Sequence, residues 1–166
     1  MERMLTRRRV VQGSVAVGAA ITFGIGLRLD APAFGARVLS PEEISVVRAV
    51  VEVLFPGPPM PLSGVDAGVV EEVDRLAEEL LEEPNVSAFR VILRALEWGT
   101  LAAQGMRFSQ LSIEERTVVI DTWSDPEVLP RRASIDYLRF ILGMAYFNHP
   151  EIRKFIGAPT VCGGPA

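Results

Sequence analysis

Apolar residues recur at spacings of three and four along most of the chain, and this pattern most limits the fold. It is clear in residues 41–55, 66–83, 86–103, 112–123 and 134–147, which are separated by Pro- and Gly-containing stretches. No convincing strand-like alternation interrupts the pattern, and no internal repeat is visible. The sequence therefore predicts an all-α domain, a compact bundle of five or six helices preceded by an N-terminal signal or anchor helix.

The ends of these helices are marked by capping and breaking residues. Capping boxes are expected at Ser40 and Ser112, each of which has Glu three positions further on. Pro84 is expected to break the second helix, and Gly105 to stop the third. Residues 56–61, with the sequence Pro-Gly-Pro-Pro-Met-Pro, cannot be helical, so we expect a surface loop there.

The first 33 residues have the three parts of an export signal: a basic start, an apolar middle and an exit of small residues. Residues 10–27 carry no charge, and Ala31-Pro32-Ala33 is an A-x-A type site before Phe34. We therefore expect a signal over 1–33 and a helical domain with an irregular tail over 34–166. The alternative is a retained anchor, because about 18 uncharged residues lie at the short edge of what spans a bilayer.

The charge of the chain is divided unevenly between these two parts. The whole chain carries a net charge of −4, but five of its arginines and only two of its acids precede Phe34. The remainder holds 12 basic and 19 acidic residues, a net charge of about −7, and Lys154 is the only lysine. An acidic body of this kind excludes sequence-independent binding of nucleic acid.

Few residues of the chain could form an active site. His149 is the only histidine and Cys162 the only cysteine, so one chain cannot assemble a His/Cys metal site. Phosphate-binding loops, dinucleotide fingerprints and nucleophile elbows are absent from the sequence. Acidic pairs at 78–79 and 82–83 are typical of a solvated helix face. We therefore expect no catalytic, cofactor-binding or metal-binding residue here.

Two of the unusual residues have alternative interpretations. His149 follows a predicted helix and is expected to cap a helix end or, alternatively, to contact a partner. Cys162 lies in the irregular tail, where it either stays a free thiol or forms a disulfide with a partner chain.

Several motifs, in their order along the chain, resemble those of a known family. The first is Thr6-Arg7-Arg8-Arg9-Val10-Val11-Gln12, which resembles the twin-arginine export motif. Then come Leu39-Ser40-Pro41-Glu42-Glu43, Phe55-Pro56-Gly57, Ala67-Gly68-Val69, and the stretches 105–115, 144–150 and 156–159. Together they resemble the gluconate 2-dehydrogenase subunit 3 family.

This resemblance implies a non-catalytic accessory subunit of a periplasmic dehydrogenase that is associated with the inner membrane and oxidises a sugar, sugar acid or alcohol. Such subunits carry no cofactor and bind a large FAD-containing subunit of the glucose-methanol-choline (GMC) type. A cytochrome c subunit with haem c often completes the complex. The small subunit supplies the address read by the twin-arginine translocase, so the large subunit is exported with it.

Export as a complex requires an interface with a sizeable apolar patch. Beside the loop at 56–61, the candidates are Tyr137, Phe140, Tyr146, Phe147, His149, Phe155 and Cys162. Core packing is the alternative for the aromatic residues. The alternative for the whole chain is a membrane-anchored helical module that tethers another periplasmic partner through the same domain.

Overall fold

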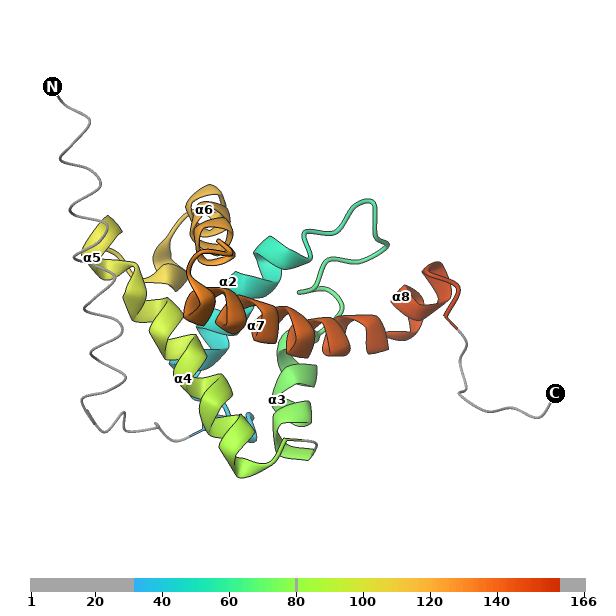
Figure 1. Ribbon diagram of the computed structural model, residues 1–166. Coiled ribbons are helices and arrows are strands. Elements are labelled where there is room, and N and C mark those ends of the chain that lie inside the picture. The colour runs from blue at the N-terminus through green and yellow to red at the C-terminus, as the bar shows by residue number, and fades with distance from the viewer. Residues whose placement is uncertain (1–31, 80, 159–166) are drawn as a thin grey trace, which may run out of the picture.

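The computed structural model describes residues 32–79 and 81–158, which form helices joined by loops (Figure 1). In chain order these are α2 (Pro41–Leu54), α3 (Val69–Glu79), α4 (Glu83–Gly99), α5 (Leu101–Gln104), the 3₁₀ helix η1 (Phe108–Gln110), α6 (Ile113–Trp123), α7 (Leu129–Asn148) and α8 (Pro150–Phe155). The described residues contain no strand, so the predicted all-α class is confirmed. The predicted export motif at Thr6, Arg7, Arg8, Val10 and Val11, and the predicted tail with Cys162, lie outside the described residues.

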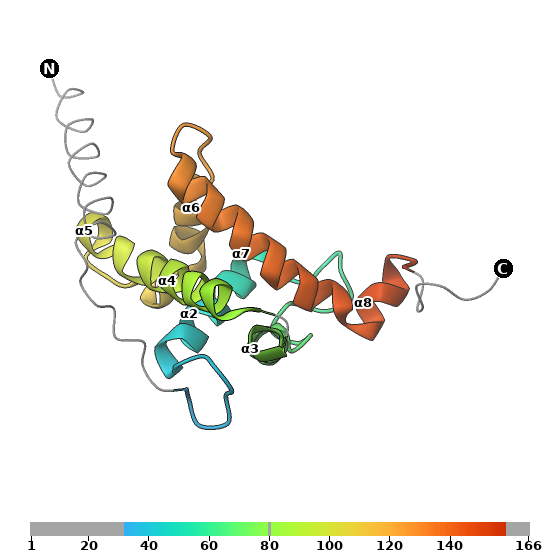
Figure 2. The ribbon, with the colours of Figure 1, turned by 60° about the horizontal axis from the view of Figure 1, so that its bottom comes forward.

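Helix α2 lies at the centre of the domain. It contacts α3, α4, α6 and η1, while the long helix α7 contacts α3 and α6 and carries α8 at its C-terminal end (Figures 1 and 2). Val47, Val50 and Val51 of α2 are at most 1% exposed and belong to one core shared by these helices. Burying each such side chain contributes roughly 1.5–3 kcal/mol relative to leaving it exposed.

Both predicted capping boxes are present. The hydroxyl of Ser40 accepts a hydrogen bond from the backbone N–H of Glu43, and the Glu43 carboxylate accepts one from the N–H of Ser40. Ser112 and Glu115 form the same pair of bonds at the start of α6. Gly105 ends α5 with φ of 73°, a left-handed conformation that glycine adopts without a Cβ penalty.

Two predicted helix starts are wrong, and both involve proline. Pro84 lies in the first turn of α4 instead of ending the helix before it. Helix α7 begins at Leu129, with Pro130 in its first turn, five residues before the predicted start. Proline fits the first turn because the backbone N–H groups there have no partner within the helix. Helix α3 is also shorter than the predicted range 66–83, spanning Val69–Glu79.

Glu43 has a second role that its capping pattern does not reveal. Its side chain is only 1% exposed and accepts hydrogen bonds from Nε of Arg90, at 2.9 and 3.0 Å, and from Nε of Arg94, at 3.2 Å. A buried carboxylate is costly unless it is paired and hydrogen-bonded. These bonds therefore tie the start of α2 to the middle of α4.

Candidate partner-binding surface

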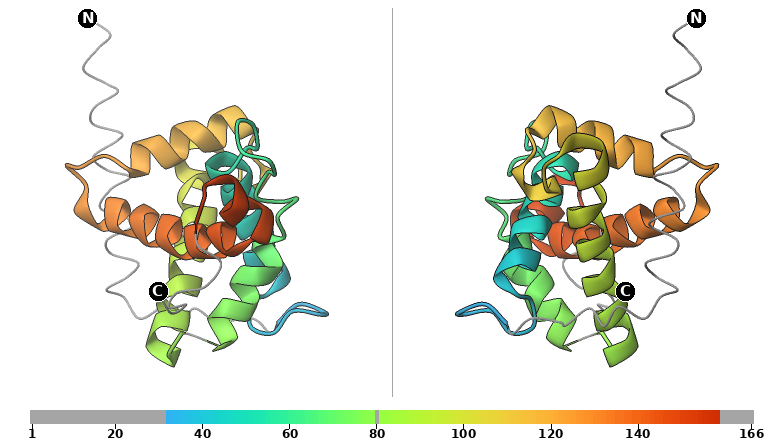
Figure 3. Two further views of the ribbon diagram at one scale, coloured as in Figure 1. Left: turned by 90° about the vertical axis from the view of Figure 1, so that its right-hand side faces the viewer. Right: turned by 90° about the vertical axis from the view of Figure 1, so that its left-hand side faces the viewer.

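The loop that follows α2 lies against the C-terminal end of α7 (Figures 1 and 3). The ring of Phe55 stacks on that of Tyr146, with 4.4 Å between centroids, and meets the ring of Phe147 edge-on at 6.5 Å. The hydroxyl of Tyr146 donates a hydrogen bond to the carbonyl of Leu62, at 2.7 Å. The predicted loop and part of the predicted aromatic cluster therefore adjoin.

The same loop is closed at its base by glycine. The N–H of Gly64 donates to the carbonyl of Phe55 at 2.8 Å. A Cβ added at Gly64 would lie 2.5 Å from Cγ1 of Val51, so only glycine allows this approach. The prolines of the loop point outward and are exposed, at Pro56, Pro58, Pro59 and Pro61. The predicted surface loop is confirmed, and it is pinned to the core at both ends.

Helix α7 is apolar on two opposite sides. On the inner side the buried residues are Ile135, Leu138, Ile141, Leu142 and Ala145, as their spacing predicts. On the outer side Phe140, Met144 and Phe147 are 62%, 42% and 46% exposed. Their spacing of four and three places them on one stripe, here called the outer stripe. Exposed apolar side chains that lie together on one face often mark a contact with a partner, so the outer stripe is a candidate contact surface.

The predicted interface residues fall into two groups. Phe140, Phe147 and Phe155 are exposed. Tyr146 is 1% exposed and Tyr137 is half-buried against the core, and burial raises the pKa of both phenols. Both tyrosines therefore pack within this chain. The interface role of the whole set stays a prediction.

Sequence pattern alone predicts Phe140, Phe147 and Phe155 as interface candidates. It does not single out Met144, which is exposed on the outer stripe, or Phe55, which contacts Phe147. The helical spacing contains the signal for Met144, since it lies four residues after Phe140 and three before Phe147. For Phe55 the only signal is its place directly before the proline loop.

His149 lies between α7 and α8. Its Nδ1 accepts a hydrogen bond from the backbone N–H of Glu151 at 3.3 Å, so it caps the start of α8, one of the two roles predicted for it. A role at a partner stays a prediction.

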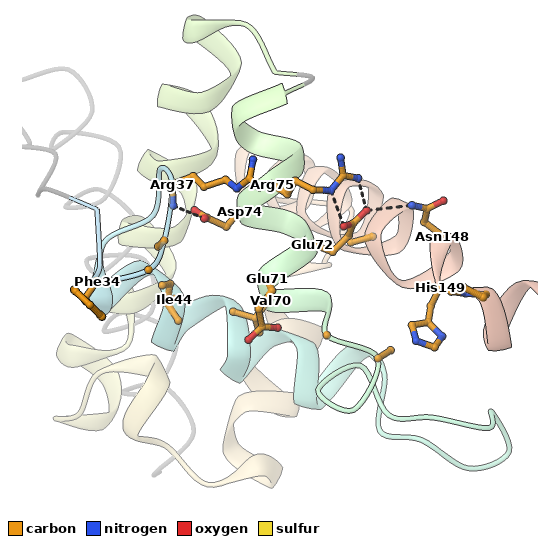
Figure 4. Close-up of a pocket in the computed structure, with 16 residues that line it drawn as sticks. Phe34, Arg37, Ile44, Val70, Glu71, Glu72, Asp74, Arg75, Asn148 and His149 are labelled. Carbon is orange, nitrogen blue, oxygen red and sulfur yellow. Dashed lines mark hydrogen bonds and ion pairs between the residues drawn. The ribbon is translucent and has the colours of Figure 1, made fainter.

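A groove of about 630 Å³ lies between residues 34–37, α3 and the junction of α7 with α8 (Figure 4). Several charged side chains along it are bonded to one another. Glu72 accepts hydrogen bonds from Nη2 of Arg75 at 2.6 Å and from Nδ2 of Asn148 at 3.1 Å. These bonds, that of Arg75 above all, lower the pKa of the Glu72 carboxyl. Arg37 pairs with Glu78 at 2.5 Å.

Asp74 anchors the segment that lines one side of this groove. Its side chain accepts hydrogen bonds from three consecutive backbone N–H groups, those of Arg37, Val38 and Leu39. Asp74 is only 6% exposed. The sequence signal for this inward position is its spacing, four residues after the buried Val70 and three before the buried Ala77. Four charged side chains at the groove, those of Arg37, Glu72, Asp74 and Arg75, are thus bonded to other groups of the chain.

In residues 32–79 and 81–158, no three His, Cys, Asp or Glu side chains are grouped so that they could hold a metal ion. In the same part of the chain, no helix has both the length and the hydropathy of a membrane span.

The family resemblance of the sequence is confirmed by a family-level comparison. The model of the family described as gluconate 2-dehydrogenase subunit 3 matches residues 41–154, which is more than half of the chain. No curated protein and no solved structure matches the chain significantly. The matched range begins at the first residue of α2 and ends one residue before the end of α8. It therefore covers all the described helices except Phe155, the last residue of α8. The chain belongs to the gluconate 2-dehydrogenase subunit 3 family.

Proposed function

We propose that this chain is the non-catalytic accessory subunit of a flavin-dependent dehydrogenase complex that acts on sugars, sugar acids or alcohols. It binds a large GMC-type subunit that carries FAD, stabilises it, and brings it to the periplasm by the twin-arginine route. A cytochrome c subunit with haem c is a further expected partner. The complex is associated with the inner membrane.

The family match over residues 41–154 is the observation that carries this proposal. An accessory subunit needs a surface for its partner, and the outer stripe of α7 leaves three large apolar side chains exposed. The export step rests on Thr6-Arg7-Arg8 followed by an uncharged stretch.

Replacement of Arg7 and Arg8 by lysine tests the export step. The chain is co-expressed with a GMC-type large subunit from the same genome, and FAD-bearing large subunit is measured in the periplasm and cytoplasm. We expect both proteins to stay in the cytoplasm of the R7K/R8K variant. Arg9→Lys is the matched control, because Arg9 follows the twin pair, and it should leave export intact.

Arrival of the large subunit in the periplasm of the R7K/R8K strain would contradict export by this chain. The mass of the native chain separates the proposal from a retained anchor. A start at Phe34 indicates cleavage after Ala33, whereas a start at Met1 indicates that the N-terminal segment is kept as a tether.

A further inference from the structure

Two segments that meet in space contain no charged residue. Residues 55–65 and 140–150 lack Asp, Glu, Lys and Arg, although 23% of the whole chain is charged. At that frequency about five of these 22 residues would carry a charge. The contacts of Phe55 with Tyr146 and Phe147 join the two segments. Asn148 and Pro150 are exposed at one end of these segments, and the other exposed residues, here called the charge-free face, are Pro56, Pro58, Pro59, Pro61, Phe140, Met144 and Phe147.

Polar groups lie at two edges of this face. At one edge Arg139 contacts Asp136 at 3.5 Å and donates a hydrogen bond to Ser124 at 3.0 Å. At another edge Asn148 donates to Glu72. Protein interfaces combine a core depleted of charge and enriched in aromatic residues and Met with a polar rim. The charge-free face has this anatomy.

The conformation of the face is set before any partner arrives. Each exposed proline has a fixed φ, and the hydrogen bonds of Tyr146 to Leu62 and of Gly64 to Phe55 hold the loop in place. Surfaces that are ordered in the free protein lose less conformational entropy on binding. The loop is therefore ordered beside the outer stripe, and the two can bind a partner together.

We infer that the charge-free face is the docking site of the large dehydrogenase subunit, which meets it with an uncharged apolar surface. This inference rests on the proposed function and specifies which surface performs it. Charge disfavours two other occupants. Residues 34–166 carry about −7, so an anionic lipid surface repels this domain. Two copies meeting by this face would bring two acidic bodies together.

Substitutions of opposite charge in the outer stripe test the inference. Phe140→Asp and Met144→Lys are each made in the full chain and co-expressed with the large subunit. Val118→Asp on α6 is the matched control, because Val118 is 61% exposed and Phe140 is 62% exposed. Thermal unfolding of each purified chain checks that the fold is kept. The dissociation constant of the complex is then measured for the unaltered chain and for the three variants.

We expect both stripe variants to raise the dissociation constant at least roughly 30-fold, as loss of an interface hot spot does. The Val118→Asp variant should stay within about threefold of the unaltered chain, as surface residues outside an interface do. Normal binding by the stripe variants, or equal losses in all three, would overturn the inference and leave the proposed function standing. Failure of the unaltered chain to bind the large subunit would overturn the proposed function itself.

Two further measurements ask whether another occupant takes the face. Light scattering reports the mass of the chain alone, and flotation reports its binding to vesicles of phosphatidylethanolamine and phosphatidylglycerol. A dimer, or vesicle binding, that Phe140→Asp abolishes would assign the face to a second copy or to the membrane and overturn the inference. Equal behaviour of the unaltered chain and this variant in both assays supports it.

Discussion

The surface around α3 and the charge-free face differ in whether their side chains have bonding partners within the chain. Around α3, Arg37, Glu72, Asp74 and Arg75 bond to other groups of the same chain. On the charge-free face, large apolar side chains remain in contact with solvent. Covering apolar surface is favourable by roughly 25 cal/mol per Å², whereas paired surface charges gain little from being covered. The charged side chains of the first surface have their partners within the chain, whereas the second is the surface on which we propose that a partner docks.

Loss of the Asp74 carboxylate should have the largest effect on the surface around α3. In Asp74→Ala three consecutive backbone N–H groups lose a charged acceptor, so we expect the free energy of unfolding to fall by roughly 3 kcal/mol. Urea denaturation measures this. Glu78→Ala is the control, because it removes only an exposed ion pair with Arg37, and it should give no measurable change. Equal losses in the two variants would contradict the anchoring role of Asp74.

Loss of the Tyr146 hydroxyl should have a smaller effect on stability and a selective effect on the charge-free face. Tyr146→Phe keeps the ring stacked on Phe55 but removes the hydrogen bond to Leu62, so we expect a loss of about 1 kcal/mol in the free energy of unfolding. The looser loop should also weaken binding of the large subunit several-fold.

The second tyrosine provides the control for this prediction. The hydroxyl of Tyr137 lies 3.4 Å from the carbonyl of Asn85, away from the charge-free face. Tyr137→Phe should therefore leave the affinity for the large subunit unchanged. If both variants lower the affinity equally, the hydrogen bond of Tyr146 does not position the loop.

The smallest predicted effect is the pH dependence contributed by Glu72. Hydrogen bonds from Arg75 and Asn148 lower its pKa in the folded state. Its contribution to stability is therefore present above the ordinary Glu pKa of about 4.3 and is lost as the pH falls through the lower folded-state value. Unfolding free energies from pH 3 to 7 should fall less steeply with acidity in Glu72→Gln.

A neighbouring acid serves as the control for this pH dependence. Glu71 is exposed one residue away on α3, and Glu71→Gln should keep the pH profile of the unaltered chain. A Glu72→Gln profile that coincides with that of the unaltered chain would show that the pairing of Glu72 does not contribute to stability.

Local signals predict much of this fold. The starts of α2 and α6 follow from the Ser40 and Ser112 capping boxes, which depend only on residues three positions apart. Pro84 and Pro130 lead to wrong predictions of where α4 and α7 begin. A proline can either end one helix or lie in the first turn of the next, and tertiary packing decides which of the two occurs.

Long-range pairings are beyond what periodicity can predict. The contact of Phe55 with Tyr146 joins residues about ninety positions apart, and nothing in either segment specifies the other. The same holds for the bonds of Glu43 to Arg90 and Arg94. The sequence predicts a proline loop and an aromatic cluster as separate interface candidates. Their union into one face requires the three-dimensional structure.

Hydrogen exchange of the chain, free and in complex with the large dehydrogenase subunit, tests most directly whether the charge-free face is the docking site. Amide exchange in residues 55–65 and 140–150 should slow on binding, while exchange in α3 (Val69–Glu79) stays the same. Slowed exchange centred on α3, with no change in the two uncharged segments, would contradict the central claim.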